Sequence, residues 1–236
     1  MKLQTLALVA TLAFTSVACH ADKTPQAVFE TFLWNKKSSD ARYTLERNKN
    51  GLKVHSEITY LVGSQGGLSN TYSIGIDGVL DSANLKNNND KSLTMYTPAK
   101  DNTSISVDVM KDGKNAGSIK IPLQAPGDIV VAFTDDPSAF AVAVDEINTH
   151  PHPNQIYTLL VPAKGKDLSR FEPYRMEGKT DAKGTLDGQE IELVHYALRF
   201  NGGMSDVYTD KDGNLMQATI APLHIRHTRK GFELKK

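Results

Sequence analysis

Cysteine is nearly absent from this 236-residue chain, since its single copy, Cys19, lies close to the N-terminus. The body of the protein therefore has no disulfide framework, no cysteine nucleophile and no cysteine-rich zinc site. Its stability must come from a hydrophobic core, and a body of about 215 residues is long enough to bury one.

An excess of charge of either sign is also missing. The 27 Lys and Arg residues balance 27 Asp and Glu residues, which gives a formal net charge of zero. A general nucleic-acid-binding protein carries a basic excess or a basic stripe, so we predict no nucleic-acid partner. Hydrophobic residues make up 39% of the chain and charged residues 23%, a balance typical of a globular protein.

Familiar catalytic and cofactor-binding motifs are missing as well. The sequence contains no Gly-x-Ser-x-Gly, no Gly-x-x-x-x-Gly-Lys and no His-Glu-x-x-His. Residues 210–214 resemble a calcium loop superficially, but glycine is at position four instead of six, and Ala221 stands where such a loop needs glutamate. We therefore predict no catalytic residue of these classes, no cofactor, and a hairpin turn at 210–214.

The one long apolar run lies at the N-terminus. Met1-Lys2 gives a positive start, residues 6–17 are almost all apolar, and small residues precede a polar segment that begins at Asp22. This order predicts a secretory signal peptide over 1–21 and hence a periplasmic or extracellular protein. The run is too short to cross a membrane, which takes about 20 residues, so we expect no transmembrane span in the mature chain, 22–236.

Two cleavage sites fit this signal. Cleavage after Ala21 leaves a soluble chain, whereas cleavage after Ala18 exposes Cys19, the position at which bacterial lipoproteins carry their lipid. The stretch has Ser16 where lipoprotein signals normally have a branched aliphatic residue. We therefore favour the soluble form, and lipid anchoring through Cys19 is the alternative.

Strand patterns dominate the rest of the chain. Residues 54–62, 104–109 and 119–123 alternate between apolar and polar side chains, which predicts strands with one buried face. Five turn signals, each an Asn or Asp followed by glycine, separate strand-like runs: Asn50-Gly51, Asp77-Gly78, Asp112-Gly113, Asp187-Gly188 and Asp212-Gly213. Because these residues tolerate the positive φ of tight hairpins, the signals favour an antiparallel meander.

One segment has helical periodicity instead. Asp136 and Pro137 are typical of a helix start. Apolar residues then recur at i, i+3, i+4 and i+7 over 140–147, and Pro151 ends the pattern. We predict one helix over about 137–148.

The segments around this helix, 129–133 and 156–161, are apolar at nearly every position, which predicts strands buried on both faces beside it. The Asn-rich segment 85–91 predicts an exposed loop. The C-terminal third predicts further strands, near 170–178, 190–200, 204–209, 214–220 and 223–234. Both faces of 190–200 are substantially apolar, as in a strongly curved sheet or in two packed sheets.

We therefore predict a single all-β domain over 22–236. Its fold class is mainly β, a curved antiparallel meander of half-barrel or clam-like shape with the helix packed on it.

Four runs near the C-terminus carry a family resemblance: residues 157–162 (Tyr-Thr-Leu-Leu-Val-Pro), 186–188 (Leu-Asp-Gly), 195–198 (His-Tyr-Ala-Leu) and 207–215 (Val-Tyr-Thr-Asp-Lys-Asp-Gly-Asn-Leu). They resemble the C-terminal hairpins of uncharacterised secreted bacterial β-sheet proteins, a domain-of-unknown-function group. That group commonly has tryptophan before the Asp-x-x-Gly turn, near the place of Tyr208. The resemblance covers the C-terminal third and implies a curved antiparallel sheet in the envelope, without implying a reaction.

Histidines are the remaining candidates for chemistry. His150 and His152 are separated by one proline, so an extended backbone would point both imidazoles toward one divalent ion. The alternative is that a histidine complements the C-terminal dipole of the helix, since no third ligand is visible nearby. His195 is either a core histidine or a partner of Asp206 or Ser205 across the next hairpin. We single out His150, His152 and His195 as candidate metal or catalytic residues.

These observations leave three functions. The first is a non-enzymatic envelope protein that binds a lipid or another apolar ligand in its curved sheet, since concave apolar sites suit small ligands. The second is an envelope assembly or interaction module that recognises another envelope protein through an exposed strand edge. The third is a metal-assisted hydrolase that uses the three histidines and a carboxylate. We favour the first over the second and the second over the third.

Overall fold

The computed structural model describes residues 27–61, 66–101, 103–123, 129–131, 136–154, 156–162, 169–200 and 203–235. The predicted signal peptide, both of its cleavage sites and Cys19 lie outside these residues, so they stay predictions. None of the helices in the described part of the chain has the length and apolarity that crossing a membrane takes.

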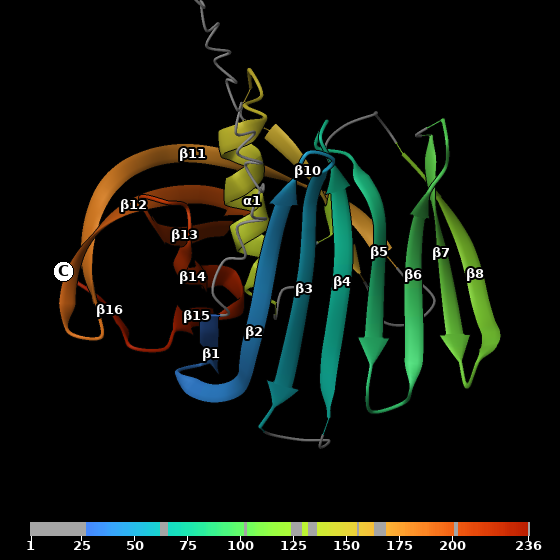
Figure 1. Ribbon diagram of the computed structural model, residues 1–236, viewed down its shortest axis with the longest axis horizontal. Helices are drawn as coiled ribbons and strands as arrows, with labels where there is room; N and C mark the ends of the chain where they lie inside the picture. Colours follow the sequence, from blue (N-terminus) through green and yellow to red (C-terminus); the bar gives the residue numbers. More distant parts are fainter. Residues whose placement is uncertain are drawn as a thin grey trace, which may run out of the picture.

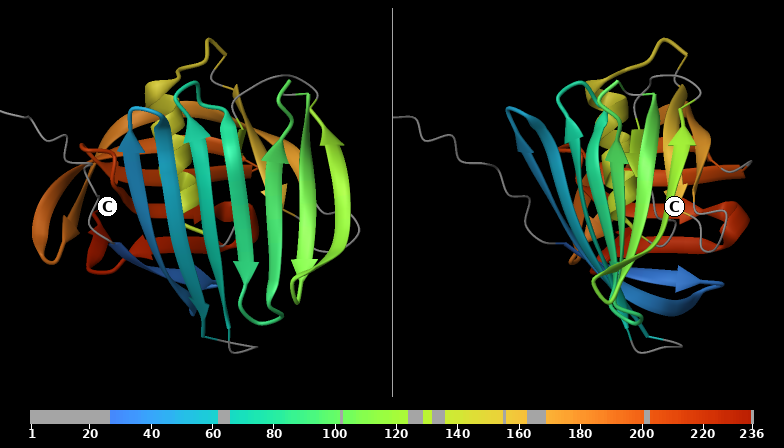
Figure 2. Two further views of the ribbon diagram at one scale, coloured as in Figure 1. Left: turned by 45° about the vertical axis from the view of Figure 1, so that its right-hand side comes forward. Right: turned by 90° about the vertical axis from the view of Figure 1, so that its right-hand side faces the viewer.

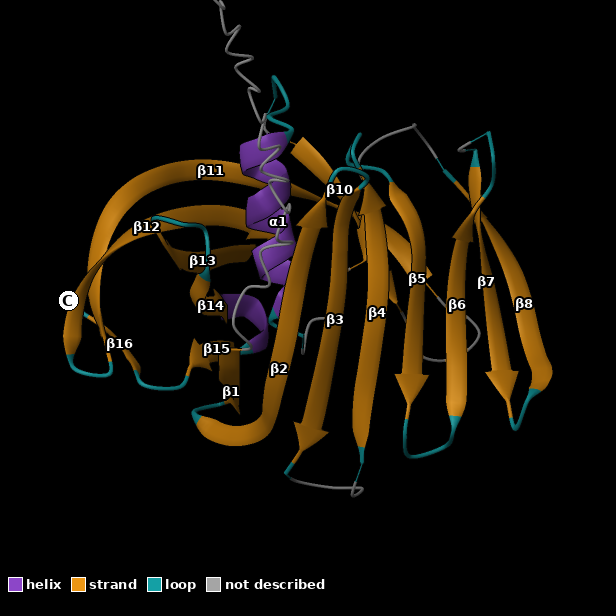
Figure 3. Ribbon diagram, viewed as in Figure 1, coloured by secondary structure: helices purple, strands orange, loops and turns teal. Residues whose placement is uncertain are grey.

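Strands make up most of the described chain (Figures 1 and 3). The N-terminal half contains eight strands: β1 (Ala27–Leu33), β2 (Lys36–Asn48), β3 (Gly51–Tyr60), β4 (Gly67–Gly75), β5 (Leu80–Asn87), β6 (Ser92–Pro98), β7 (Ser104–Lys111) and β8 (Lys114–Pro122). The C-terminal half follows: β9 (Ile129–Val131), α1 (Ser138–Thr149), β10 (Ile156–Pro162), β11 (Ser169–Leu186), β12 (Gln189–Phe200), β13 (Gly203–Asp210), β14 (Leu215–Ile220), the 3₁₀ turn η1 (Ala221–Leu223), β15 (Ile225–Arg229) and β16 (Phe232–Leu234).

One curved sheet contains all of these strands. Its order runs from β8 back to β1, continues across to β15, and then runs back through β14 to β9. Neighbours are antiparallel except β9 and β10, which are parallel. The β1–β15 pair, with Phe29 opposite Arg229, joins the two halves, and the sheet is not closed because β8 and β9 end the order. The predicted mainly-β fold and single curved antiparallel meander are confirmed.

All five predicted turns join neighbouring antiparallel strands. In two of them, Asp112-Gly113 and Asp187-Gly188, both residues have positive φ, as a tight type I′ hairpin requires. Gly51 has a φ of 133°, and a Cβ there would lie 2.0 Å from the carbonyl oxygen of Ile74, so β3 needs glycine to approach β4. The sequence did not reveal the β1–β2 turn, where Trp34 and Asn35 have positive φ without any glycine.

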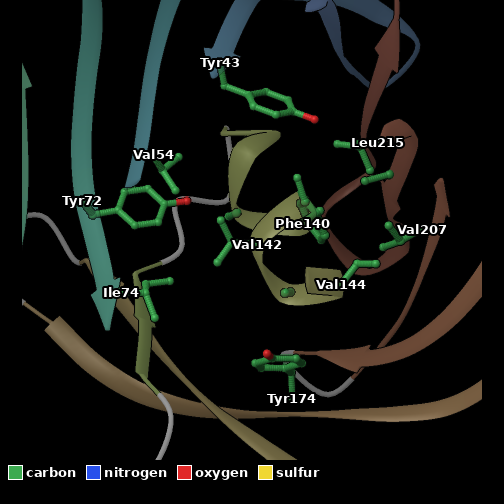
Figure 4. Packing of buried hydrophobic residues seen from close by; sticks show 14 of the residues in the cluster. Tyr43, Val54, Tyr72, Ile74, Phe140, Val142, Val144, Tyr174, Val207 and Leu215 are labelled. Atoms are coloured by element: carbon green, nitrogen blue, oxygen red, sulfur yellow. The ribbon is translucent and has the colours of Figure 1, made fainter. Parts of the chain in front are cut away.

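The helix α1 lies between the two halves of the sheet and fills the space that they enclose (Figure 2). Its position along the chain agrees with the prediction to within one residue. Nine of its residues are buried: Ser138, Ala139, Phe140, Ala141, Val142, Ala143, Val144, Glu146 and Ile147. Figure 4 shows Phe140, Val142 and Val144 between Tyr72 of β4 and Leu215 of β14. The helix is therefore part of the core of both halves, not a cover on one face.

A second, smaller apolar cluster explains why β12 is apolar on both faces. Tyr196 and Leu198 belong to the main core with α1. Leu193 points the other way and packs with Met216 and Phe232. The short strand β16, which carries Phe232, pairs with the last three residues of β11. The C-terminal half therefore buries apolar side chains on both of its faces.

Two local predictions are wrong in part. Residues 85–87 belong to β5, and the turn begins only after them, because Leu85 packs against the main core and pairing with β4 and β6 overrides the polar composition. Ile156 is 45% exposed, so β10 is not buried on both faces at its first residue. The side chains at 129–133 and 158–161 lie outside the described residues.

The burial of α1 predicts a large effect of truncating its aromatic residue. Phe140→Ala should lower the free energy of unfolding by about 3–5 kcal/mol, because it leaves a cavity between the two halves. Ile76→Ala, at a side chain that is 63% exposed, should change it by less than about 0.5 kcal/mol. Urea unfolding followed by circular dichroism measures both, and equal effects would show that α1 does not support the core.

Candidate functional site

The N-terminal end of α1 is held by a buried carboxyl group. Asp136 is fully buried. Its Oδ2 accepts hydrogen bonds from the Ser56 hydroxyl at 2.5 Å and the Asn70 amide at 2.6 Å. Its Oδ1 accepts the backbone N–H of Ser138 at 2.9 Å, the capping role that the sequence predicts. Burial raises the pKa of Asp136, although these hydrogen bonds act in the opposite direction.

The other end of α1 is held by polar contacts to both halves of the sheet. The side-chain amide of Asn148 donates to the Tyr196 hydroxyl of β12 at 3.0 Å. The Lys179 ammonium of β11 donates to the side-chain oxygen of Asn148, Oδ1, at 3.2 Å. From the N-terminal half, Arg47 of β2 pairs with Asp145. Both ends of the helix are therefore fixed, and so is the space beside it.

A cleft of about 450 Å³ lies beside the C-terminal half of α1. Apolar side chains from β2, β3 and α1 line one part of it: Leu45, Leu52, Ala141 and Val144. Charged and polar residues line the rest: Arg47, Asp145, Asn148, Asp212, Gly213 and Asn214. The volume is within the range typical of small-molecule sites, and the lining suits a ligand with an apolar body and a polar group.

A smaller hollow of about 160 Å³ borders this cleft and shares Asn214 with it. The polar residues of its lining are Tyr43, Asp210, Asn214 and Arg229. Burial raises the pKa of the Tyr43 hydroxyl far above its ordinary value, so this group stays protonated and can donate a hydrogen bond. The two hollows together extend along the inner side of β2.

The 210–214 segment that lines both hollows is a hairpin turn, as predicted. Asp210 Oδ1 accepts the backbone N–H groups of Asp212 and Asn214 at 3.0 and 2.8 Å. These bonds use the Asp210 carboxylate to hold the turn, and Gly213 has a positive φ of 85°. The turn therefore presents Asn214 to the cleft on a fixed backbone.

His195 makes one of its two predicted pairings. Its Nε2 lies 2.8 Å from Asp206 Oδ1 on β13, and its Nδ1 lies 3.3 Å from the Thr180 hydroxyl. Its ring stacks on Tyr208 with 4.6 Å between the ring centroids. Ser205 is fully buried and points to the other face of β13, because neighbouring residues of a strand alternate in direction. The pair lies on the face away from α1, and the hydroxyl within reach of His195 there belongs to Thr180, not to Ser205.

His150 and His152 lie near the C-terminal end of α1, but each contacts different groups. His150 Nδ1 is 3.2 Å from Glu146 Oε2, and its Nε2 is 2.9 Å from the carbonyl oxygen of Ile76. The His152 ring meets Tyr157 edge-on at 5.0 Å. Across the described ranges, no three His, Cys, Asp or Glu side chains come together in a way that could hold a metal ion. The candidate histidines therefore do not form a joint site with one another there.

Sequence reasoning missed one buried histidine among the described residues. His227 is fully buried, its Nδ1 lies 2.9 Å from the Thr31 hydroxyl, and its ring lies 5.8 Å from that of Phe140. Its central place in the short segment 225–229 could have indicated that the His227 side chain faces the core. The basic residues around it, however, suggested an exposed segment. The cleft beside α1 was also missed, because its lining comes from four separate segments: β2, β3, α1 and the β13–β14 turn.

Comparison with known proteins supports the fold. No family model and no curated protein matches the sequence. Among solved structures, the chain is similar to a β-barrel-like protein of a domain of unknown function, DUF1849, from Brucella abortus. The alignment covers 89% of this chain and 97% of that one, with a TM-score of 0.51 and 10% sequence identity. The chain thus shares its fold with an uncharacterised bacterial β protein, which agrees in this coarse sense with the resemblance in the C-terminal third.

The raised pKa of Asp136 predicts a dependence of stability on pH. A carboxyl group whose pKa is raised in the folded state contributes stability fully below its unfolded pKa, near 3.8. This contribution is lost as the pH rises through the raised pKa. Relative to Asp136→Asn, the wild type should therefore lose free energy of unfolding as the pH rises above about 3.8.

Denaturant unfolding of both proteins across this pH range measures the difference, and parallel curves would contradict it. Asp136→Ala serves as the control for the cap itself. It removes the acceptor for Ser138 and leaves the Ser56 and Asn70 donors without their partner, so relative to Asp136→Asn it should cost roughly 2–4 kcal/mol at every pH.

Proposed function

We propose that this protein is a non-enzymatic protein of the cell envelope that binds a lipid or another apolar ligand with a polar group. The cleft beside α1 carries this proposal, because four apolar side chains line one part of it and charged groups line the rest. An acyl chain or similar apolar body would lie against Leu45, Leu52 and Val144. Its polar group would lie near Arg47 and Asp145, where hydrogen-bonding partners are available.

The position of α1 restricts where such a ligand binds. The helix occupies the middle of the space between the two halves, with Val142 and Val144 almost fully buried. A ligand therefore binds beside the helix and does not replace it. The cleft is partly open to solvent, so a ligand can enter without unfolding of the sheet.

The interaction-module function has weaker support from the sheet edges. β8 ends the strand order and could in principle add a strand from another protein. However, it carries Lys114, Lys120 and a terminal Pro122, which are residues that protect edge strands from pairing. The hydrolase function lacks an assembled site among the described residues, since His150 and His195 contact separate carboxylates.

Ligand binding is tested by placing a charge on the apolar part of the cleft. Leu45→Glu should weaken binding of a long-chain fatty acid or a hydrophobic fluorescent dye by about tenfold or more, because the ligand must then bury a carboxylate. Thr44→Glu is the matched control, since the neighbouring side chain on β2 points to the opposite face and lines a separate outer hollow. Fluorescence titration measures both variants.

The natural ligand is tested by solvent extraction of the purified protein and mass spectrometry. Recovery of a lipid from the wild type and Thr44→Glu, but not from Leu45→Glu, would support the cleft as its site. Equal dye binding by both variants, or no bound lipid and no dye binding by the wild type, would contradict the proposal.

The envelope location is tested by fractionating bacteria that express the full chain. We expect the mature protein to begin at Asp22 and to appear in the periplasmic or extracellular fraction, because residues 1–21 read as a signal peptide. Intact-mass spectrometry distinguishes this form from a lipid-modified chain that begins at Cys19 and stays with membranes. An unprocessed chain in the cytoplasm would contradict the location.

A further inference from the structure

The turn between β1 and β2 carries a residue that its backbone does not favour. Trp34 and Asn35 have φ values of 52° and 61°, the left-handed conformation in which Asn and Gly are preferred and bulky side chains are strained. Trp34 is the single tryptophan of the chain, and 65% of it is exposed. A large apolar side chain therefore occupies a strained backbone position and remains mostly exposed.

Leu33, the residue before Trp34, is also exposed, at 43%. The Trp34 ring stacks on His224 with 3.6 Å between centroids. We refer to Leu33, Trp34 and His224 as the tryptophan tip, which lies at an outer corner of the molecule where the β1–β2 turn meets η1 (Figures 1 and 2).

The charges around the tryptophan tip are unbalanced toward positive. The acidic groups Glu30 and Asp40 both pair with Lys37, at 2.8 and 2.7 Å. Lys36 follows the turn and is exposed. The Arg226 guanidinium lies over the Phe32 ring, 4.7 Å from its centroid. The three cations Lys36, Lys37 and Arg226 therefore outnumber the two local carboxylates by one positive charge.

We propose that the tryptophan tip docks the protein onto the surface of an anionic lipid membrane. Tryptophan favours the interfacial region of a bilayer, and neighbouring Lys and Arg side chains are attracted to anionic headgroups. A stable protein interface buries about 800 Å² on each partner, whereas two exposed apolar side chains on one turn supply far less. A bilayer accepts a small convex tip of this kind. This site is separate from the cleft beside α1 and does not depend on ligand binding there.

The single tryptophan makes the proposal directly measurable. Protein purified from cells that express the full chain is mixed with vesicles of equal parts phosphatidylglycerol and phosphatidylcholine. A second sample is mixed with vesicles of phosphatidylcholine alone. We expect the Trp34 emission to shift to shorter wavelength with the anionic vesicles, since its ring leaves water. The shift should be smaller with neutral vesicles and should decrease as salt is added, because salt screens exposed charges.

Co-sedimentation with vesicles does not depend on Trp34 fluorescence, so it can compare variants that lack this residue. Trp34→Asn should keep the melting temperature of the wild type or raise it, because asparagine suits the positive φ. It should nevertheless weaken binding to anionic vesicles by about tenfold. Lys36→Gln should weaken it by about fivefold, the effect of one basic residue near an anionic surface. Ile76→Asn, at a similarly exposed apolar residue outside the tip, should bind as the wild type does.

Three results would overturn the proposal. They are an unchanged emission with no co-sedimentation on anionic vesicles, equal binding by Trp34→Asn and the wild type, and a pull-down of an envelope protein that needs Trp34, with no binding to vesicles. The last result would indicate a protein partner instead. Leu45→Glu distinguishes this proposal from the ligand-binding one, because it alters the cleft and should leave vesicle binding unchanged.

Discussion

The burial of α1 between the two halves of the sheet is the constraint on which the rest of the structure depends. A long sheet that curves without closing leaves a concave apolar surface that water would otherwise contact. The helix removes this surface from water because its first two turns, residues 138–144, are buried all round, with Phe140, Val142 and Val144 facing different strands. Polar contacts of Asp136, Asp145 and Asn148 then fix how the helix is oriented between the two halves.

Those end contacts also determine the shape of the cleft. Asp136 fixes the first turn of α1 to β3 and β4, while Asn148 fixes its last turn to β12. Between these points the helix packs closely on both halves, except where β2, β3 and the β13–β14 turn diverge from it. The cleft is thus the space that the helix does not fill, and its mixed lining follows from apolar helix residues facing a polar turn.

The sequence predicted the local features of this fold well because each depends on residues close together in the chain. The Asp-Gly turns and the helix over 137–148 are of this kind, and the His195–Asp206 pair lies across one hairpin. The buried partners of Asp136 could not be predicted, since Ser56 and Asn70 lie 80 and 66 residues before it. The cleft needs four separate segments in register, and no local pattern encodes that. The Trp34-Asn35 turn escaped notice because it contains no glycine.

The pairing of β1 with β15 has a consequence for how the chain reaches its native state. The first described strand cannot find its partner until almost the whole chain is available, which places the joining of the two halves late in folding. Before that point, β2 to β8 can form hairpins between neighbours, but their inner face has neither α1 nor the opposite half against it. A newly made chain therefore exposes this surface until the two halves join, and apolar surface exposed in this way favours aggregation.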